Sequence, residues 1–100
     1  MNKGKRTQTV GLDTVVVAAD EVVSCDLSGE EAMLDLASGV YYGLNGVGSA
    51  VWRQIRQPAR VSDVVAGVVS EYEVEPERCE RDVVALIQRL VDAGVARGVE

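Results

Sequence analysis

An α+β fold is predicted for this chain, with an antiparallel sheet in its N-terminal half and helices in its C-terminal half. Apolar residues alternate with a period of two between Met33 and Leu44, which is the pattern of half-buried strands. Valines recur at intervals of three and four between Val61 and Tyr72, which is the pattern of an amphipathic helix. A longer helical pattern begins at Pro76 and ends at Gly94. Together these observations separate a sheet-forming half from a helical half.

The length and composition of the chain are those of one small domain. Its 100 residues are 47% apolar, with no Phe and one Trp, so a single core of Val, Ala and Leu is expected. So little material would hardly build a deep catalytic cleft. Residues 1–9 show no periodicity and are predicted to form a flexible tail, which leaves residues 10–100 as the domain.

Two β-branched runs precede the alternating segment. Val15–Val17 and Val22–Leu27 are separated by Ala19-Asp20-Glu21, so they form two short strands or two halves of one strand. In the second run, Val23, Cys25 and Leu27 fall on one face. With the strands that follow, the N-terminal half is predicted to be a small antiparallel sheet of about three strands.

A β-hairpin that leads directly into a helix is predicted next. Leu34 and Leu36 are expected to face the core from the first strand, and Ser38-Gly39 supplies the turn. Val40, Tyr42 and Leu44 repeat the alternation in the second strand. Asn45 is a good N-cap for a helix over residues 46–56, in which Trp52 is the largest anchor and whose glycines allow close approach to the sheet.

Two further helices complete the predicted fold. The second spans Val61–Tyr72, and because position 60 is Arg, either Ser62 or a poor cap must start it. The third begins at Pro76, an acceptable first helical residue, and ends at Asp92 or Ala93 before Gly94. A short strand over residues 95–97 can follow. This order of elements fits a winged helix-turn-helix with an N-terminal three-stranded antiparallel sheet followed by three helices.

The residue inventory argues against catalysis. The absence of histidine removes the usual general base and the commonest metal ligand. Cys25 and Cys79 lie too far apart in sequence for a zinc site and are interpreted as reduced, buried thiols. Gly43, Gly46 and Gly48 lack the lysine of a phosphate-binding loop. We therefore expect no enzymatic activity, no metal and no cofactor.

The charge of the chain argues against nucleic acid as a partner. The net charge is −6 and the pI about 4.6, whereas nucleic-acid binding requires clustered Lys and Arg. Lys3, Lys5 and Arg6 form the one basic cluster, and it falls in the predicted tail. No apolar segment typical of a secretory signal lies in residues 1–9, and the longest apolar run, Val15–Ala19, is too short to span a bilayer. The expected location is the cytoplasm, without a membrane partner.

A binding surface is predicted at the second strand of the hairpin. Val40–Leu44 is expected to lie at an edge of the sheet, where its N–H and C=O groups lack partners. A peptide can add there as a further strand and gain affinity from main-chain hydrogen bonds. Tyr41 and Tyr42 point to opposite faces, so one can pack inward while the other shapes the rim.

The third helix carries an apolar stripe that is wider than core packing needs. The stripe is centred on Val83, Ile87 and Leu90. Either a Val-rich small domain simply buries this wide face, or one of its margins faces a groove, with a polar rim beside an apolar floor. The two candidate margins are Leu86 with Asp82 and Arg89 on one side, and Val84 with Val91 on the other.

Two segments of the sequence resemble the PqqD-like family, whose members are RiPP precursor peptide recognition elements. These segments are MLDLASGVYYGLNGVGSAVW and VEPERCERDVVALIQRLVDAGV, and the resemblance covers Val22 to Val95. It is strongest in the Leu-Asp-Leu strand with its Ser-Gly turn, in YYGLN and in the helix from Asp82 to Gly94. The YYGLN form in a stand-alone chain is most similar to the discrete leader-recognition proteins of lasso-peptide biosynthesis.

This resemblance implies a winged helix-turn-helix that binds the leader of a ribosomally made precursor without catalysis. It implies that the leader adds antiparallel to the third strand, against the third helix, and is presented to a separate leader peptidase, a transglutaminase-like cysteine protease. A macrolactam-forming cyclase is a further candidate partner. Arg60 departs from the Thr that often caps the second helix in relatives. The contacts carried over are Val40, Tyr41, Tyr42, Gly43 and Leu44 on the strand, and Asp82, Val83, Leu86, Arg89 and Leu90 on the helix.

Three alternative functions are weighed against leader recognition for a peptidase. A PqqD-like chaperone that serves a radical enzyme or another modifying enzyme would bind its leader in the same way. A DNA-binding winged helix would place the third helix in a groove, but that helix mixes acidic residues with Arg78, Arg81 and Arg89. A thiol enzyme is disfavoured because neither cysteine has a cationic setting that would lower its pKa.

Overall fold

The computed structural model describes residues 9–28 and 30–99, apart from the side chain of Asn45. The described residues form three α-helices and six strands, so the predicted α+β class is confirmed. The predicted tail lies outside them except for Thr9, as does the basic cluster of Lys3, Lys5 and Arg6, and the domain boundary at residue 10 stays a prediction. The elements are β1 (Val15–Ala18), β2 (Val22–Leu27), β3 (Glu30–Asp35), β4 (Tyr41–Asn45), α1 (Val47–Ile55), β5 (Ala59–Arg60), α2 (Val61–Glu71), α3 (Pro76–Asp92) and β6 (Ala96–Val99).

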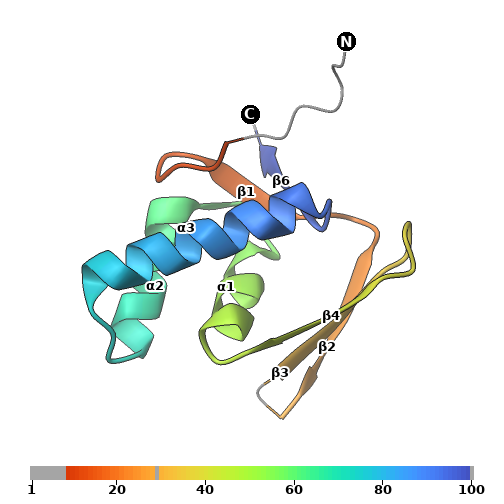
Figure 1. The fold of residues 1–100 in the computed structure, drawn as a ribbon, viewed down its shortest axis with the longest axis horizontal. Coiled ribbons are helices and arrows are strands. Elements are labelled where there is room, and N and C mark those ends of the chain that lie inside the picture. Colours follow the sequence, from red (N-terminus) through yellow and green to blue (C-terminus); the bar gives the residue numbers. More distant parts are fainter. Residues whose placement is uncertain (1–8, 29, 100) are drawn as a thin grey trace.

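The strands form two antiparallel sheets of three strands each, in the orders β2-β3-β4 and β5-β1-β6. The small N-terminal sheet is confirmed as β2-β3-β4. β1 does not belong to it, because Val15 and Val16 pair with β5 and the whole of β1 pairs with β6. β1 therefore pairs with two segments that are distant from it in sequence. One of them, β5, was not predicted from the sequence. In Figure 1 the β2-β3-β4 sheet extends away from the helices, and β1 and β6 lie together at the opposite end.

The buried face of β3 differs from the predicted one. Met33 is fully buried and Glu31 and Asp35 are nearly so, whereas Leu34 is half-buried and Leu36 is 59% exposed. The expectation that Leu34 and Leu36 face the core was wrong. Leu36 lies beyond the strand, in a turn that Asp35 closes by accepting hydrogen bonds from the Ala37 N–H at 3.1 Å and the Ser38 hydroxyl at 2.9 Å.

The outer face of β2 is open to solvent. Val23, Cys25 and Leu27 share one face as predicted, but that face is exposed. The expectation that Cys25 is buried was therefore wrong. The inward face of β2 carries Ser24, whose hydroxyl accepts a hydrogen bond of 3.2 Å from the indole N–H of Trp52. A free thiol is present at both Cys25 and Cys79, and Cys79 is buried as predicted.

The core lies where the helices meet the inner faces of both sheets. Trp52 is 1% exposed, which confirms it as the anchor of α1. Met33 of the small sheet and Val16 of the other sheet belong to the same buried cluster, as do Val83 and Ile87 of α3. One core therefore holds the two sheets and the three helices together.

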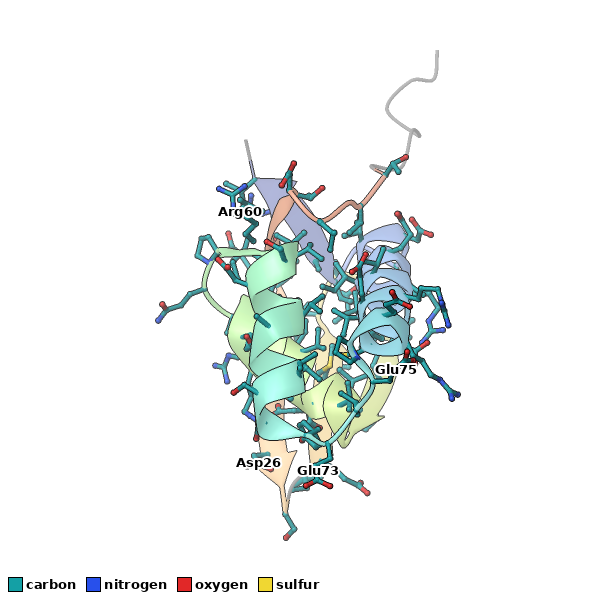
Figure 2. The ribbon with its side chains drawn as sticks, turned by 90° about the vertical axis from the view of Figure 1, so that its left-hand side faces the viewer. Asp26, Arg60, Glu73 and Glu75 are labelled. Carbon is teal, nitrogen blue, oxygen red and sulfur yellow. The ribbon has the colours of Figure 1, made fainter. Side chains whose placement is uncertain are left out.

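The helices follow the sequence patterns closely, but the N-cap residues of α1, α2 and α3 make no side-chain cap hydrogen bond. The N-cap of α1 is Gly46, with φ +53°, and not the predicted Asn45. Arg60 caps α2 without a side-chain hydrogen bond, as expected from its residue type. The first N–H groups of α2 instead donate to the carbonyls of Thr14 and Leu12 at 2.9 and 3.0 Å. Figure 2 shows Arg60 at this end of α2 and Glu73 beyond its other end.

The third helix has the predicted limits. It begins at Pro76 and ends at Asp92, and Gly94 follows with φ +82°, a left-handed conformation that favours glycine. The chain then enters β6, one residue later than the predicted strand over residues 95–97. None of the helices within the described residues is long and apolar enough to cross a membrane.

Candidate functional site

Strand β4 is an edge strand of the small sheet, as predicted. The order β2-β3-β4 leaves one side of β4 without a neighbouring strand. A free edge exposes main-chain donors and acceptors that can pair with another chain. β2 is the other edge of this sheet, but the groove described below borders β4.

The register identifies which main-chain groups of β4 are free. The carbonyl of Val40 accepts a hydrogen bond of 3.0 Å from the opposite strand, and the pairing continues without a bulge. Because hydrogen-bonded pairs alternate along an antiparallel ladder, Tyr42 and Leu44 bond to β3. The N–H and C=O groups of Tyr41 and Gly43 then point to the open edge, where no other described group bonds to them.

A groove of about 680 Å³ separates β4 from α3 and has the start of α1 as its floor. The free edge of β4 borders this groove, because Gly43 and Leu44 both line it. An extended peptide paired with β4 would therefore lie over the groove. Its lining residues are Gly43, Leu44, Val47, Gly48, Val74, Glu75, Arg78, Cys79, Asp82, Leu86 and Arg89.

The floor of this groove is apolar. The side chains of Leu44 and Leu86 both lie against Gly48, where an added Cβ would lie 3.4 Å from Leu44 Cδ2 and 3.8 Å from Leu86 Cδ2. The expected close approach of the first helix to the sheet is therefore confirmed at Gly48. Leu44 and Leu86 are half-buried, so each still presents apolar surface to an incoming side chain.

The structure brings together half of the predicted site residues. Gly43, Leu44, Asp82, Leu86 and Arg89 line the groove, so Leu86 and its neighbours form the margin that faces it, and Val84 and Val91 do not. The other predicted residues lie elsewhere. Val83 and Leu90 are buried in the core, Tyr42 packs against it, Tyr41 is 73% exposed, and Val40 precedes the strand and is also exposed.

Sequence reasoning missed the residues that extend the groove toward the start of α3. Glu75, Arg78, Asp82, Leu86 and Arg89 recur at intervals of three and four and form one stripe along the helix. That spacing is a signal that could have found Glu75 and Arg78. The contributions of Val47 and Gly48 of α1 have no such signal, because they depend on how α1 packs against β4.

Ser49 is a second residue that the sequence did not single out. Its hydroxyl is buried, donates to the carbonyl of Leu44 at 2.8 Å and accepts from the N–H of Glu31 at 3.2 Å. A side chain of α1 thus bridges β3 and β4 at Leu44, which lines the groove. This bridge holds the floor and the free edge in one arrangement.

The charges along the α3 wall are partly paired. Arg78 Nε lies 3.8 Å from Asp82 Oδ2, one turn further along the helix, and both side chains are largely exposed. Arg89 forms no ion pair within the described residues. Among these residues, no cluster of three or more His, Cys, Asp or Glu side chains could hold a metal ion.

The thiol in the groove is not set up as a nucleophile. Burial raises the pKa of Cys79, and the negative charge of Asp82 raises it further. The thiolate is the reactive form of cysteine, so at neutral pH the Cys79 thiol stays protonated. This setting therefore does not favour thiol chemistry at Cys79.

We expect Cys79 to react with an aromatic disulfide reagent much more slowly than Cys25 in the folded protein. Cys25 is exposed, whereas Cys79 is buried and has a raised pKa. The rate at Cys79 should still rise with pH after that of a free thiol has levelled off. Stopped-flow absorbance measurements on the Cys25→Ser and Cys79→Ser variants give the reaction rate of each remaining thiol separately. Urea-unfolded protein is the control. Equal rates in the folded state would contradict this description of the groove.

Comparison with known proteins places the chain in a family. Residues 30–96, which include β4, the groove and all three helices, match the family model described as coenzyme PQQ synthesis protein D (PqqD). The chain belongs to the PqqD family. No curated protein sequence matches this PqqD-family chain significantly.

Two solved structures resemble this PqqD-family protein over most of its length. TbiB1 in complex with the TbiA(beta) leader peptide is 30% identical, with a TM-score of 0.77, and the match covers 84% of this chain and 98% of that chain. Lasso peptide synthetase B1 complexed with the leader peptide is also 30% identical, with a TM-score of 0.71 over 81% of this chain and 95% of that chain. Both similar proteins are leader-peptide complexes.

Proposed function

We propose that this protein binds the leader segment of a ribosomally synthesised precursor peptide, without catalysing a reaction itself. The leader would add as an antiparallel strand to the free edge of β4 and place alternate side chains in the groove against α3. The observation that carries this proposal is the open edge of β4 beside an apolar-floored groove. Main-chain bonds at the edge would supply affinity, and the groove would supply specificity.

The family and the solved relatives support the same function. The chain is a member of the PqqD family, and both similar structures contain a leader peptide. The match spans 98% and 95% of the two relatives' own chains. The part of each relative that binds a leader therefore has a counterpart in this chain. The residues proposed to contact the leader are Val40, Tyr41, Tyr42, Gly43, Leu44, Asp82, Val83, Leu86, Arg89 and Leu90.

We further propose that the bound leader is presented to a separate leader peptidase in lasso-peptide biosynthesis in the cytoplasm. The description of one relative as lasso peptide synthetase B1 supports the pathway. The peptidase would be a transglutaminase-like cysteine protease, with a macrolactam-forming cyclase as a further partner. A co-purification of the tagged chain with the peptidase encoded beside it tests this step. Absence of a complex both with and without the precursor would contradict it.

We also propose that α2 and α3 form the helix-turn-helix pair of a winged helix. The connector between them is short, and β6 follows α3 directly and returns to pair with β1. The side of α3 that lines the groove mixes acidic with basic residues, which does not favour DNA as a partner. An experimental structure in which α2 and α3 pack side by side without a sharp crossing would contradict this assignment.

The alternative of a chaperone for a radical or other modifying enzyme shares the leader site. The family description, which names coenzyme PQQ synthesis, favours it, whereas the two lasso-type relatives favour the peptidase pathway. The genes beside this one distinguish the two. A peptidase and a cyclase next to a small precursor would support the first proposal, and a radical enzyme would support the second.

We expect Leu86→Ala to weaken binding of a fluorescent leader peptide, from the precursor encoded nearby, by about tenfold. The substitution removes apolar surface from the floor, and apolar anchors in the centre of an interface carry most of its energy. Fluorescence anisotropy gives the affinity, and thermal unfolding checks the fold.

Val84→Ala is the matched control for this prediction. Val84 is a half-buried valine on the same helix, but it does not line the groove. Its replacement should leave the affinity within about twofold of the parent. An absence of saturable binding by the parent protein would overturn the proposed function, and equal affinities of Leu86→Ala and the parent would overturn the role of the groove.

A further inference from the structure

The wall that α3 contributes to the groove has one cation without a counter-charge. Arg78 and Asp82 face each other one turn apart, with their charged atoms at 3.8 Å. Arg89 has no ion pair within the described residues, and the nearest carboxylate further along the helix, Asp92, accepts a hydrogen bond of 3.0 Å from Gln88. The guanidinium of Arg89 is therefore exposed at the rim and available to a ligand.

The position of Arg89 relative to the apolar floor determines the spacing between two side chains of a bound leader. Figure 1 shows that β4 and α3 run in opposite directions, so the end of α3 that bears Arg89 lies toward the beginning of β4. Leu86 and Leu44 both lie against Gly48 at the floor, and Arg89 is three residues beyond Leu86, about 4.5 Å along the helix axis. Side chains on one face of a strand are about 6.8 Å apart, which is about 2 Å more than this step and within the reach of the long Arg side chain.

We propose that the leader carries an Asp or Glu two residues C-terminal to the apolar side chain that occupies the floor, and that this carboxylate pairs with Arg89. This inference rests on the proposed function and on antiparallel addition to β4, which directs the C-terminal part of the leader toward the beginning of the strand. A carboxylate matches a guanidinium in both charge and hydrogen-bond geometry.

The net charge of the chain limits the preference for a carboxylate to one position of the leader. The net charge of −6 disfavours an acidic peptide as a whole, since long-range forces between like charges oppose association. One carboxylate opposite Arg89 gains a partner, whereas a carboxylate near Glu75, at the other end of the groove, meets a like charge. The leader is therefore expected to carry a single acidic residue at this place and not an acidic run.

Selection from a displayed library of random peptides on the immobilised full-length chain tests the inference without a known leader. The parent should enrich an apolar residue followed two positions later by Asp or Glu. Arg89→Glu should enrich Lys or Arg at that second position. Arg81→Glu is the matched control, because it reverses an exposed charge on the same helix away from the groove and should leave the selection unchanged.

Binding of one enriched peptide and its Asp→Lys counterpart then measures the effect. The exchange should weaken binding to the parent about three- to tenfold and strengthen binding to Arg89→Glu, with both effects reduced at high salt. Apolar enrichment without a charge preference, or a preference that Arg89→Glu leaves unchanged, would overturn the role of Arg89 but not the proposed function. No enrichment by the parent would overturn the proposed function itself.

Discussion

Gly43→Pro is expected to weaken leader binding about 10- to 100-fold while the protein stays folded. The N–H of Gly43 points to the open edge of β4, so its loss removes one main-chain bond to the leader and leaves a leader carbonyl unpaired. The proline ring also occupies the place of the incoming strand. Proline is tolerated in an edge strand where its missing N–H would face solvent. Titration of the fluorescent leader peptide measures the loss.

Gly43→Ala is the control that separates a main-chain effect from a change of side chain. A Cβ at Gly43 meets no atom within 4 Å, and the N–H is retained. Its affinity should stay within about threefold of the parent, because surface substitutions of this kind have small effects. Circular dichroism and thermal unfolding must show that Gly43→Pro is folded. Parent-like affinity in folded Gly43→Pro would exclude strand addition at β4.

Trp52→Ala is expected to lower the free energy of unfolding by about 3–5 kcal/mol, which is a large part of the 5–15 kcal/mol typical of a domain. Trp52 is the largest of the fully buried side chains in the described part of the chain. It joins α1 to the small sheet, both by packing and through its hydrogen bond to Ser24. Urea unfolding followed by far-ultraviolet circular dichroism measures the loss, since the variant has no Trp fluorescence.

Two controls divide this effect between packing and hydrogen bonding. Ser24→Ala removes only the acceptor and should cost about 1 kcal/mol. Trp52→Phe keeps an aromatic ring and should cost less than Trp52→Ala. Because α1 is the floor of the groove, the folded fraction of Trp52→Ala should also bind the leader more weakly. A loss below about 1 kcal/mol in Trp52→Ala would contradict the central place of this residue in the core.

The candidate site could be predicted from the sequence only where it depends on the spacing of residues that are close together in the chain. The edge strand and the stripe of α3 were both recognisable, because alternation and helical periodicity are properties of neighbouring residues. Which of the two margins of α3 faces the groove was not recognisable from the sequence. Leu86 and Arg89 face the groove because of how α3 packs on the core through Val83, Ile87 and Leu90, and no pattern within α3 records this.

The strands show the same division. The alternation in β3 identified a strand, but the face covered by the core is that of Met33 and not that of Leu34. A one-residue change in phase turns every side chain to the other face, so the covered face depends on the register with β2 and β4. Cys25 is exposed for the same reason, because the core covers the opposite face of β2.

The sequence by itself determined the α+β class, the limits of α3 between Pro76 and Gly94, and the hairpin that leads into α1. These features depend on period, capping and turn residues, which act over a few positions. Only the tertiary structure decided that β1 leaves the small sheet for β5 and β6, and that the start of α1 becomes the floor beneath the open edge of β4. Those outcomes depend on contacts between residues far apart in the chain, whose free energies no local pattern records.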